Sequence, residues 1–227
     1  MSVITISRKL GSMGHYVGRK LADELGYTFV DKQKIFKIMK DYGFSKFDYI
    51  YENVPTLWDR YDEYRDMTIN FLAEVIVAVA QHDNVVIVGR GSFGLLDAYS
   101  DVINIRVKAP NAFRVHNIMK DREITEAEAT KILKQNDRVR RAFVESDMRF
   151  NYTDTTEFDI ILDTSIIRPD ICVEFLKTGI LDNKGIRDDV RPKVVDTEIE
   201  PVLIKHVNTM LSYFDANKEE IIKRTEI

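Results

Sequence analysis

Cysteine and long hydrophobic runs are scarce in this sequence of 227 residues. The single cysteine, Cys172, excludes an intramolecular disulfide and argues against a cysteine-based zinc site. No apolar stretch reaches the length needed to span a bilayer, and the first residues lack the basic segment and apolar run of a secretion signal. These absences predict a reduced, soluble, cytoplasmic protein that does not interact with membranes.

An excess of positive charge is also missing, because the formal net charge is −4. General nucleic-acid binding needs a large basic field that releases counterions, so the composition argues against it, although local basic patches are compatible with this balance. Hydrophobic residues make up 44% and charged residues 31%, enough for a core under a well-solvated surface. The length suits one α/β domain with a small mobile insertion.

Short apolar, β-branched runs recur along the chain. They lie at residues 3–6, 27–30, 85–88, 102–107 and 158–162. Such runs are typical of strands buried on both faces, as in a parallel sheet covered by helices. Segments of helical length separate the runs and supply the crossover connections that parallel pairing requires. The pattern predicts an α/β fold with a five-stranded parallel sheet.

The helix that follows the first predicted strand is the clearest. Val17, Leu21 and Leu25 form one apolar stripe, and Gly26 follows as a stop. Residues 34–81 are expected to hold two or more helices, the last from about residue 68 to 80. Residues 125–128 form a capping box that opens a helix reaching about Arg141.

The C-terminal segment is different in character. Residues 182–200 are polar and charged, and predict a loop or arm. After Pro201, a helical stripe follows, formed by Leu203, Val207, Met210, Leu211 and Phe214. This stripe is expected to pack on the domain or on a second subunit, so a homodimer is one interpretation.

A glycine-rich loop follows the first predicted strand. It runs from Ser7 to Tyr16 with glycines at positions 11 and 14, and leads into an amphipathic helix. In this geometry backbone N–H groups and the helix dipole converge on an anion, and glycine lets the backbone approach it closely. Arg8 and Lys9 add positive charge. The full phosphate-loop signature is G-x-x-x-x-G-K-[ST], and here His15 and Tyr16 stand in the region of its lysine and hydroxyl. An ordinary turn shaped by glycine is the alternative interpretation.

Several segments resemble the cytidylate kinase-like family, in the order in which that family carries them. They are Ile4-Thr5-Ile6-Ser7-Arg8-Lys9-Leu10-Gly11-Ser12-Met13-Gly14, Tyr27-Thr28-Phe29-Val30-Asp31-Lys32, Val85-Val86-Ile87-Val88-Gly89-Arg90-Gly91, Asn136-Asp137-Arg138-Val139-Arg140-Arg141 and residues 158–165. The resemblance implies a three-layer P-loop NTPase-type fold for residues 1–182, with an acceptor-binding helical region at about 32–70 and a lid at about 114–150. Residues 183–227, a C-terminal arm and helix, lie outside it.

The resemblance implies transfer of the γ-phosphoryl group of Mg²⁺-ATP to a nucleoside monophosphate, by default CMP or dCMP. Loop and resemblance together assign the ATP site to Arg8, Lys9, Gly11, Ser12, Met13, Gly14, His15, Tyr16, Arg122 and Arg140. The transfer itself is assigned to Arg114, Arg138, Arg141 and His15, and the acceptor to Asp31, Arg90 and Asp137. No metal ligand from the protein is assigned. Nucleotide and small-molecule acceptor are the expected partners.

Arg90 and Asp31 each follow a predicted strand, where open α/β sheets place their ligands. The resemblance implies that Arg90 holds the acceptor's phosphate; the alternative is a surface arginine paired with an acid. The resemblance implies that Asp31 faces the acceptor and orients a hydroxyl or a hydrated metal; the alternative is a cap of the next helix, and the two roles are compatible.

The arginine run of the lid region contains two that can share a helical face, Arg138 and Arg141. Arg140 is then free to pair with an acid such as Asp137. A solvated charged helix is the alternative to phosphate contact.

His15 is a possible phosphate donor in place of the lysine, stronger below its own pKa. Trp58 and the tyrosines around it, Tyr49, Tyr51, Tyr61 and Tyr64, indicate packing rather than a wall against a base. Two other functions stay open. One is a nucleotide-binding or regulatory protein that has lost catalysis, because the lysine and hydroxyl are missing and Gly91 stands where cytidylate kinases carry Asp. The other is a kinase of a non-nucleotide small molecule.

Overall fold

The computed structural model describes residues 3–56, 59, 62–182 and 190–217. Its strands are β1 (Val3–Arg8), β2 (Thr28–Val30), β3 (Val85–Val88), β4 (Val102–Lys108) and β5 (Ile160–Asp163). They form one parallel sheet in the order β2-β3-β1-β4-β5. The predicted five-stranded parallel sheet is therefore confirmed.

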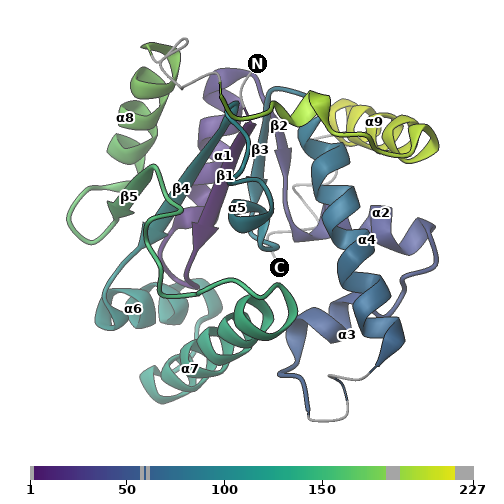
Figure 1. Ribbon diagram of the computed structural model, residues 1–227. Helices are drawn as coiled ribbons and strands as arrows, with labels where there is room; N and C mark the ends of the chain where they lie inside the picture. The colour runs from purple at the N-terminus through teal and green to yellow at the C-terminus, as the bar shows by residue number, and fades with distance from the viewer. Residues whose placement is uncertain (1–2, 57–58, 60–61, 183–189, 218–227) are drawn as a thin grey trace.

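Helices cover both faces of this sheet (Figure 1). They are α1 (Gly14–Leu25), α2 (Lys32–Asp41), α3 (Phe47–Glu52), α4 (Glu63–Ala80), α5 (Ser92–Leu95), α6 (Asn111–Arg122), α7 (Glu126–Ala142), α8 (Pro169–Asp182) and α9 (Pro201–Ala216). A π-helical turn, Phe143–Asp147, follows α7, and a 3₁₀ turn, Val194–Asp196, precedes α9. No helix in the described part of the chain is long and apolar enough to cross a membrane.

The core consists of two large apolar clusters, one on each face of the sheet. Strand β3 shows the division, because Val85 and Ile87 join the cluster under α4 and α9, while Val86 and Val88 join the one under α1 and α8. All four side chains are buried. Successive residues of a strand point to opposite faces, so a continuous apolar run marks a strand covered on both sides. The result is a three-layer α/β fold.

Several helices begin or end at local sequence signals that were recognisable beforehand. Gly26 adopts a left-handed conformation, φ 69°, and closes α1. Asp31 caps α2 by accepting hydrogen bonds from the N–H groups of Gln33 and Lys34. Thr125 and Glu128 form the predicted capping box at α7. Helix α4 begins at residue 63, earlier than the expected residue 68.

The parallel strands all direct their carboxyl ends toward α3 and α7, at the lower side of Figure 1. The loops after β1 and β3 meet there because these strands are paired, with Ile6 opposite Val88. The amide of Gly89 donates to the carbonyl of Ile6 across the pair, at 3.0 Å. Two loops distant in sequence, the glycine-rich loop and the Gly89–Gly91 turn, thus share one edge of the sheet.

Candidate functional site

Three arginines from three elements meet in a cleft at this sheet edge. Arg8 ends β1, Arg90 follows β3, and Arg140 projects from the last turn of α7. The cleft holds about 320 Å³ and is also lined by Arg122 and Tyr51, among others. We call Arg8, Arg90 and Arg140 the arginine cluster and the space beside them the arginine cleft. Three of the arginines assigned from sequence to phosphate contact, Arg8, Arg90 and Arg140, are thereby brought together.

Arg90 is almost completely buried, with 2% of its surface exposed. Its Nε and Nη2 atoms are buried without a hydrogen-bond partner among the described residues. Burial lowers the pKa of this guanidinium, although the Tyr51 phenol and Asp48 act in the opposite direction. A buried cation with unused donors is costly unless an anion completes it. The site is therefore suited to an anionic group that accepts from Arg90.

Tyr51, on α3, carries a phenol that interacts electrostatically with all three arginines of the cluster. The Arg90 guanidinium lies over its ring, 3.3 Å from the centroid. Burial alone would raise the pKa of this phenol, but Arg90, Arg140 and Arg8 together outweigh burial and lower the pKa to about 7. A phenol with this pKa exists partly as an anion at neutral pH and offsets part of the cluster's charge.

Arg8 is partly exposed as a whole residue, and its guanidinium is the part that is removed from water. Burial, followed by repulsion from Arg140, lowers its pKa to about 9, while Tyr51 counteracts the shift by charge and by a hydrogen bond. Arg140 Nη1 donates to the Arg8 carbonyl oxygen and fixes α7 to the end of β1. Within the described residues, no carboxylate forms an ion pair with Arg8, Arg90 or Arg140. The cluster carries a concentrated positive charge in a chain that is acidic overall.

The glycine-rich loop wraps the start of α1. Gly11 has φ 76°, and a Cβ there would lie 2.5 Å from the Arg114 carbonyl oxygen, so the loop requires glycine at this position. Ser12 is fully buried and its hydroxyl donates to the Lys9 carbonyl at 2.7 Å. Met13 precedes α1 in a left-handed conformation, φ 59°. The first N–H groups of α1 follow directly, and these are the groups that bind anions at a helix N-terminus.

Arg114 and Asp137, assigned from sequence to transfer and to the acceptor, bind each other. Arg114 has no exposed surface, and its Nη1 and Nη2 donate to the two carboxylate oxygens of Asp137 at 2.8 and 2.6 Å. Its Nε donates to the carbonyl of Leu10. Asp137 is therefore the partner of Arg114 and not of Arg140. The pair fixes α6, α7 and the glycine-rich loop in one arrangement.

The other lid arginines lie apart from the cluster. Arg138 is exposed on α7, and Arg141 is exposed with its Nε donating to Glu145 at 3.0 Å, one helical turn away. Arg122 lines the arginine cleft from the end of α6. Of the three arginines in residues 138–141, the one that reaches the cleft is Arg140.

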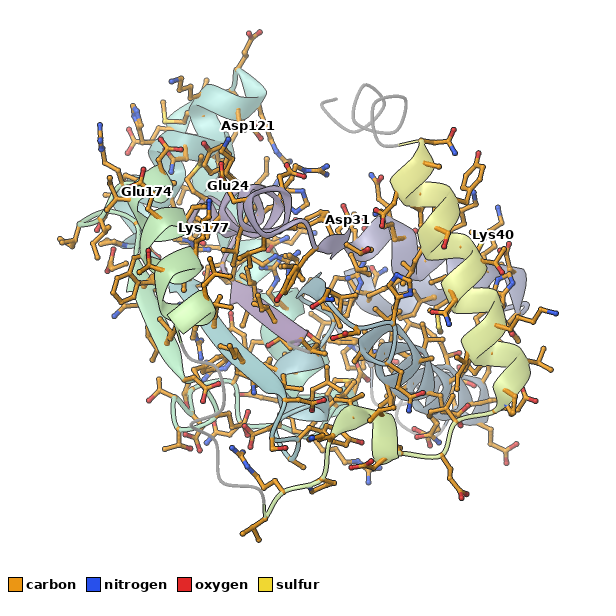
Figure 2. All side chains as sticks on the ribbon, turned by 90° about the horizontal axis from the view of Figure 1, so that it is seen from above. Glu24, Asp31, Lys40, Asp121, Glu174 and Lys177 are labelled. Carbon is orange, nitrogen blue, oxygen red and sulfur yellow. The ribbon has the colours of Figure 1, made fainter. Side chains whose placement is uncertain are left out.

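The remaining loop residues surround the start of α1. The His15 ring packs edge-on against Phe29, and burial is the main cause that lowers the pKa of this imidazole, opposed by the negative charge of Asp31. The Tyr16 hydroxyl donates to Asp170 at the start of α8. The pKa of Lys9 is lowered, mainly by burial. Asp31 directly follows β2 and caps α2 with its side chain, and Figure 2 labels it in the view from above.

Tyr51 contributes to the site in a way that the sequence did not indicate. The aromatic residues around position 51 predicted packing, and the sequence carries no periodic signal that separates Tyr51 from its neighbours. Trp58 and Tyr61 lie outside the described residues. His116 and His206 lie on α6 and α9, and His206 contacts Asp41 at 3.3 Å. No group of three His, Cys, Asp or Glu that could hold a metal ion occurs among the described residues.

The donor set fits phosphate groups. Loop amides at the start of α1, the unused donors of Arg90 and the charge of the cluster are all of the kind that bind phosphate oxygens. Mg²⁺ in such sites is held by one or two carboxylates, by water and by the phosphates themselves, so it does not need a cluster of acids. Asp31 is close enough to His15 to raise the pKa of its imidazole and is a carboxylate of this kind.

Comparison with known proteins agrees with this geometry. A family model described as the cytidylate kinase-like family matches residues 3–166. A cytidylate kinase from Ignicoccus hospitalis is 27% identical over 182 residues, which cover 80% of this chain and all of that protein.

Solved structures show the same fold. An uncharacterized protein from Eubacterium ventriosum ATCC 27560 has a TM-score of 0.63 and 18% identity, with 81% of this chain and all of that one covered. A sugar kinase from Janibacter sp. HTCC2649 has a TM-score of 0.50 and 17% identity, with 79% and 94% covered. At these identities the likeness concerns the fold and not the substrate.

Proposed function

The chain belongs to the cytidylate kinase-like family, and we propose that it transfers the γ-phosphoryl group of ATP to the phosphate of a nucleoside monophosphate. CMP and dCMP are the first acceptors to test, since a relative with 27% identity is a cytidylate kinase. One observation carries the proposal: a buried guanidinium, Arg90, has unused donors at the carboxyl edge of the sheet, beside a glycine-rich loop. This is where α/β folds bind phosphate-bearing ligands.

Phosphoryl transfer depends on positioning and on neutralising charge more than on covalent help from the protein. In the proposed site, Arg90 holds the phosphate of the acceptor, and amides at the start of α1 hold the phosphates of the donor. Arg140 lines the same cleft as Tyr51 of α3 and offsets the charge on the transferred group. Bound Mg²⁺ supplies further positive charge on the phosphate oxygens, and Asp31 is the carboxylate we assign to it through water.

Arg114 and Asp137 have a positioning role in this proposal. Their ion pair holds the Arg114 side chain in place, and Arg114 Nε donates a hydrogen bond to the carbonyl oxygen of Leu10 in the glycine-rich loop. The pair thereby fixes the backbone of that loop. Arg138 and Arg141 are exposed, so we assign them no contact in the conformation described. Burial lowers the pKa of His15 and so disfavours its charged form, and we assign it a hydrogen-bonding role without a charge.

The test is release of ADP from Mg²⁺-ATP in the presence of CMP, dCMP, UMP, AMP or GMP. We expect turnover that requires one of these acceptors. Arg90→Ala should lower kcat/KM by about 100-fold, because charged hydrogen bonds to the acceptor phosphate contribute about 1.5–3 kcal/mol. The matched control is Lys131→Ala, an exposed cation on α7, which should leave the rate unchanged. A lack of acceptor-dependent ADP release across the whole panel would contradict the proposal.

A second candidate is a nucleotide-binding protein without catalysis. It is supported by the sequence of the glycine-rich loop, which lacks the lysine and hydroxyl of the full signature. This candidate predicts that ATP or CMP raises the Tm in a concentration-dependent manner while no ADP is released. Acceptor-dependent turnover by the purified protein would exclude it.

A further inference from the structure

Gly14, the first residue of α1, faces the side chain of Arg8. A Cβ at position 14 would lie 2.5 Å from Arg8 Cβ and 3.1 Å from Arg8 Cγ. Cβ atoms in folded proteins do not approach other carbon atoms this closely, and Arg8 Cβ is fixed to the backbone, so it cannot swing away. Positions 8 and 14 therefore cannot both carry a side chain in this backbone arrangement.

The same two positions correspond to particular residues of the full phosphate-loop signature. Helix α1 opens at Gly14, and Met13 before it has the left-handed backbone that glycine adopts most readily. With Met13 in the place of the signature's second glycine, the lysine position falls on Gly14 and not on the His15 expected from sequence. The first glycine position then falls on Arg8. The signature has glycine and then lysine at these two positions, whereas this chain has arginine and then glycine. The positively charged residue and the glycine have thus exchanged positions.

The Arg8 side chain runs from Gly14 to Gly89. Its stem passes the Cα of Gly14, and its Nη1 would lie 2.0 Å from a Cβ at Gly89, which has φ 84°. Its guanidinium lies close enough to Tyr51 for the two to shift each other's pKa, and it lines the arginine cleft. The Arg8 side chain thus extends between Gly14 and Gly89 from the end of β1 into the cleft, and a side chain at either position would clash with it.

We propose that Arg8 replaces the phosphate-loop lysine and binds the terminal phosphate of a nucleoside triphosphate, and that Gly14 is side-chain-free to make room for it. The proposal deepens the function proposed above and rests on it only in taking the donor to be a nucleoside triphosphate. Arginine can bind phosphate oxygens in pairs and stays charged when buried better than lysine does. Among the described residues no carboxylate forms an ion pair with Arg8, so a bound ligand is free to supply the negative charge that its guanidinium needs.

The test is a set of variants measured by calorimetric binding of a non-hydrolysable ATP analogue and by Tm. Arg8→Gly and Arg8→Met should each weaken binding by about 10- to 100-fold, because charged hydrogen bonds are lost. Gly14→Lys alone should lower the Tm by about 5 °C, because its Cβ is forced against Arg8. The double variant Arg8→Gly, Gly14→Lys restores the glycine and the lysine of the signature at these two positions, and should regain the Tm and bind within about tenfold of wild type. Lys131→Ala is the control for loss of one positive charge.

Arg8→Met keeps an apolar stem of similar length, so it reports on charge even if Arg8→Gly folds poorly. Analogue binding by Arg8→Met as tight as wild type would overturn the assignment of Arg8. A double variant no better than Gly14→Lys in both Tm and binding would overturn the exchange. Binding and Tm are measured without turnover, so a protein that releases no ADP can still reveal the exchange of the cation and the glycine. If the enzyme is active and Arg8→Met binds the analogue as tightly as wild type, only the role of Arg8 is refuted.

Discussion

At the scale of single residues, Tyr51 controls the charge that the arginine cluster presents. The three guanidiniums lower the pKa of its phenol to about 7 although burial raises it. As the pH falls from 8 to 6, most of the phenolate takes up a proton, and the net positive charge of the cleft rises by about 0.8. An anion of constant charge should then bind more tightly at the lower pH.

We expect the affinity for sulfate, which keeps its charge over this range, to rise by about tenfold from pH 8 to pH 6. That factor is the ratio of the protonated fractions of a phenol with a pKa of about 7. Calorimetric titration at both pH values measures it. Tyr51→Phe should bind at pH 8 as tightly as the wild type does at pH 6. A similar pH dependence in Tyr51→Phe would show that another group titrates.

Single residues at strand ends were predictable from sequence, and their contacts were not. Arg8 and Arg90 each follow an apolar run, and parallel strands bring such positions to one edge of the sheet. The partner of Arg114 was not predictable, because Asp137 is 23 residues away on another helix. The Tyr51 phenol lies in a region where aromatic residues occur without periodicity, so its place depends on how α3 packs against α7.

At the scale of helices, a buried ion pair connects α4 to the π-helical turn after α7. Arg65 Nε and Nη2 each lie 2.7 Å from a carboxylate oxygen of Asp147, and both side chains are buried. Removing the acid leaves an unpaired buried cation. We expect Asp147→Ala to lower the free energy of unfolding by about 3 kcal/mol, measured by urea denaturation.

The control for that prediction is Glu145→Ala in the same turn. Glu145 binds Arg141, and both side chains are exposed, at 41% and 53%. Loss of an exposed pair should change the free energy of unfolding by less than about 0.5 kcal/mol. Equal effects of the two substitutions would mean that burial does not distinguish the pairs in solution.

Helix boundaries were predictable where a local hydrogen bond marks them. The capping box at Thr125 and the stop at Gly26 depend on side-chain type and backbone freedom, which are properties of the local sequence. Helix α4 starts earlier than expected because Asp62 accepts from the N–H of Tyr64. That cap lies in a stretch of charged residues whose apolar periodicity is weak, so the periodic pattern alone placed the start several residues late.

At the scale of the whole molecule, the C-terminal segment packs across the body of the protein. Ser100 N–H donates to the carbonyl of Pro192, and Gln81 Nε2 donates to the carbonyls of Val194 and Thr197. Helix α9 then lies against α4 and α2, as Figure 1 shows. The apolar stripe predicted from sequence is on the buried side of this helix. Periodicity identified the stripe, but which surface it covers depends on long-range packing.

This packing predicts that α9 contributes to the stability of the domain. Leu211 is fully buried in the cluster that also contains Leu72 and Ile76 of α4. Leu211→Ala should lower the free energy of unfolding by about 3 kcal/mol, the range for truncating a buried leucine, and the Tm by about 9 °C. Val202→Ala on the exposed side of α9, where the side chain is 64% exposed, should change stability by less than about 0.5 kcal/mol. If Leu211→Ala changed the stability as little as Val202→Ala does, α9 would not be docked on α4 in solution. A single cooperative unfolding transition whose Tm is lowered by Leu211→Ala and not by Val202→Ala would show that the helix unfolds together with the sheet.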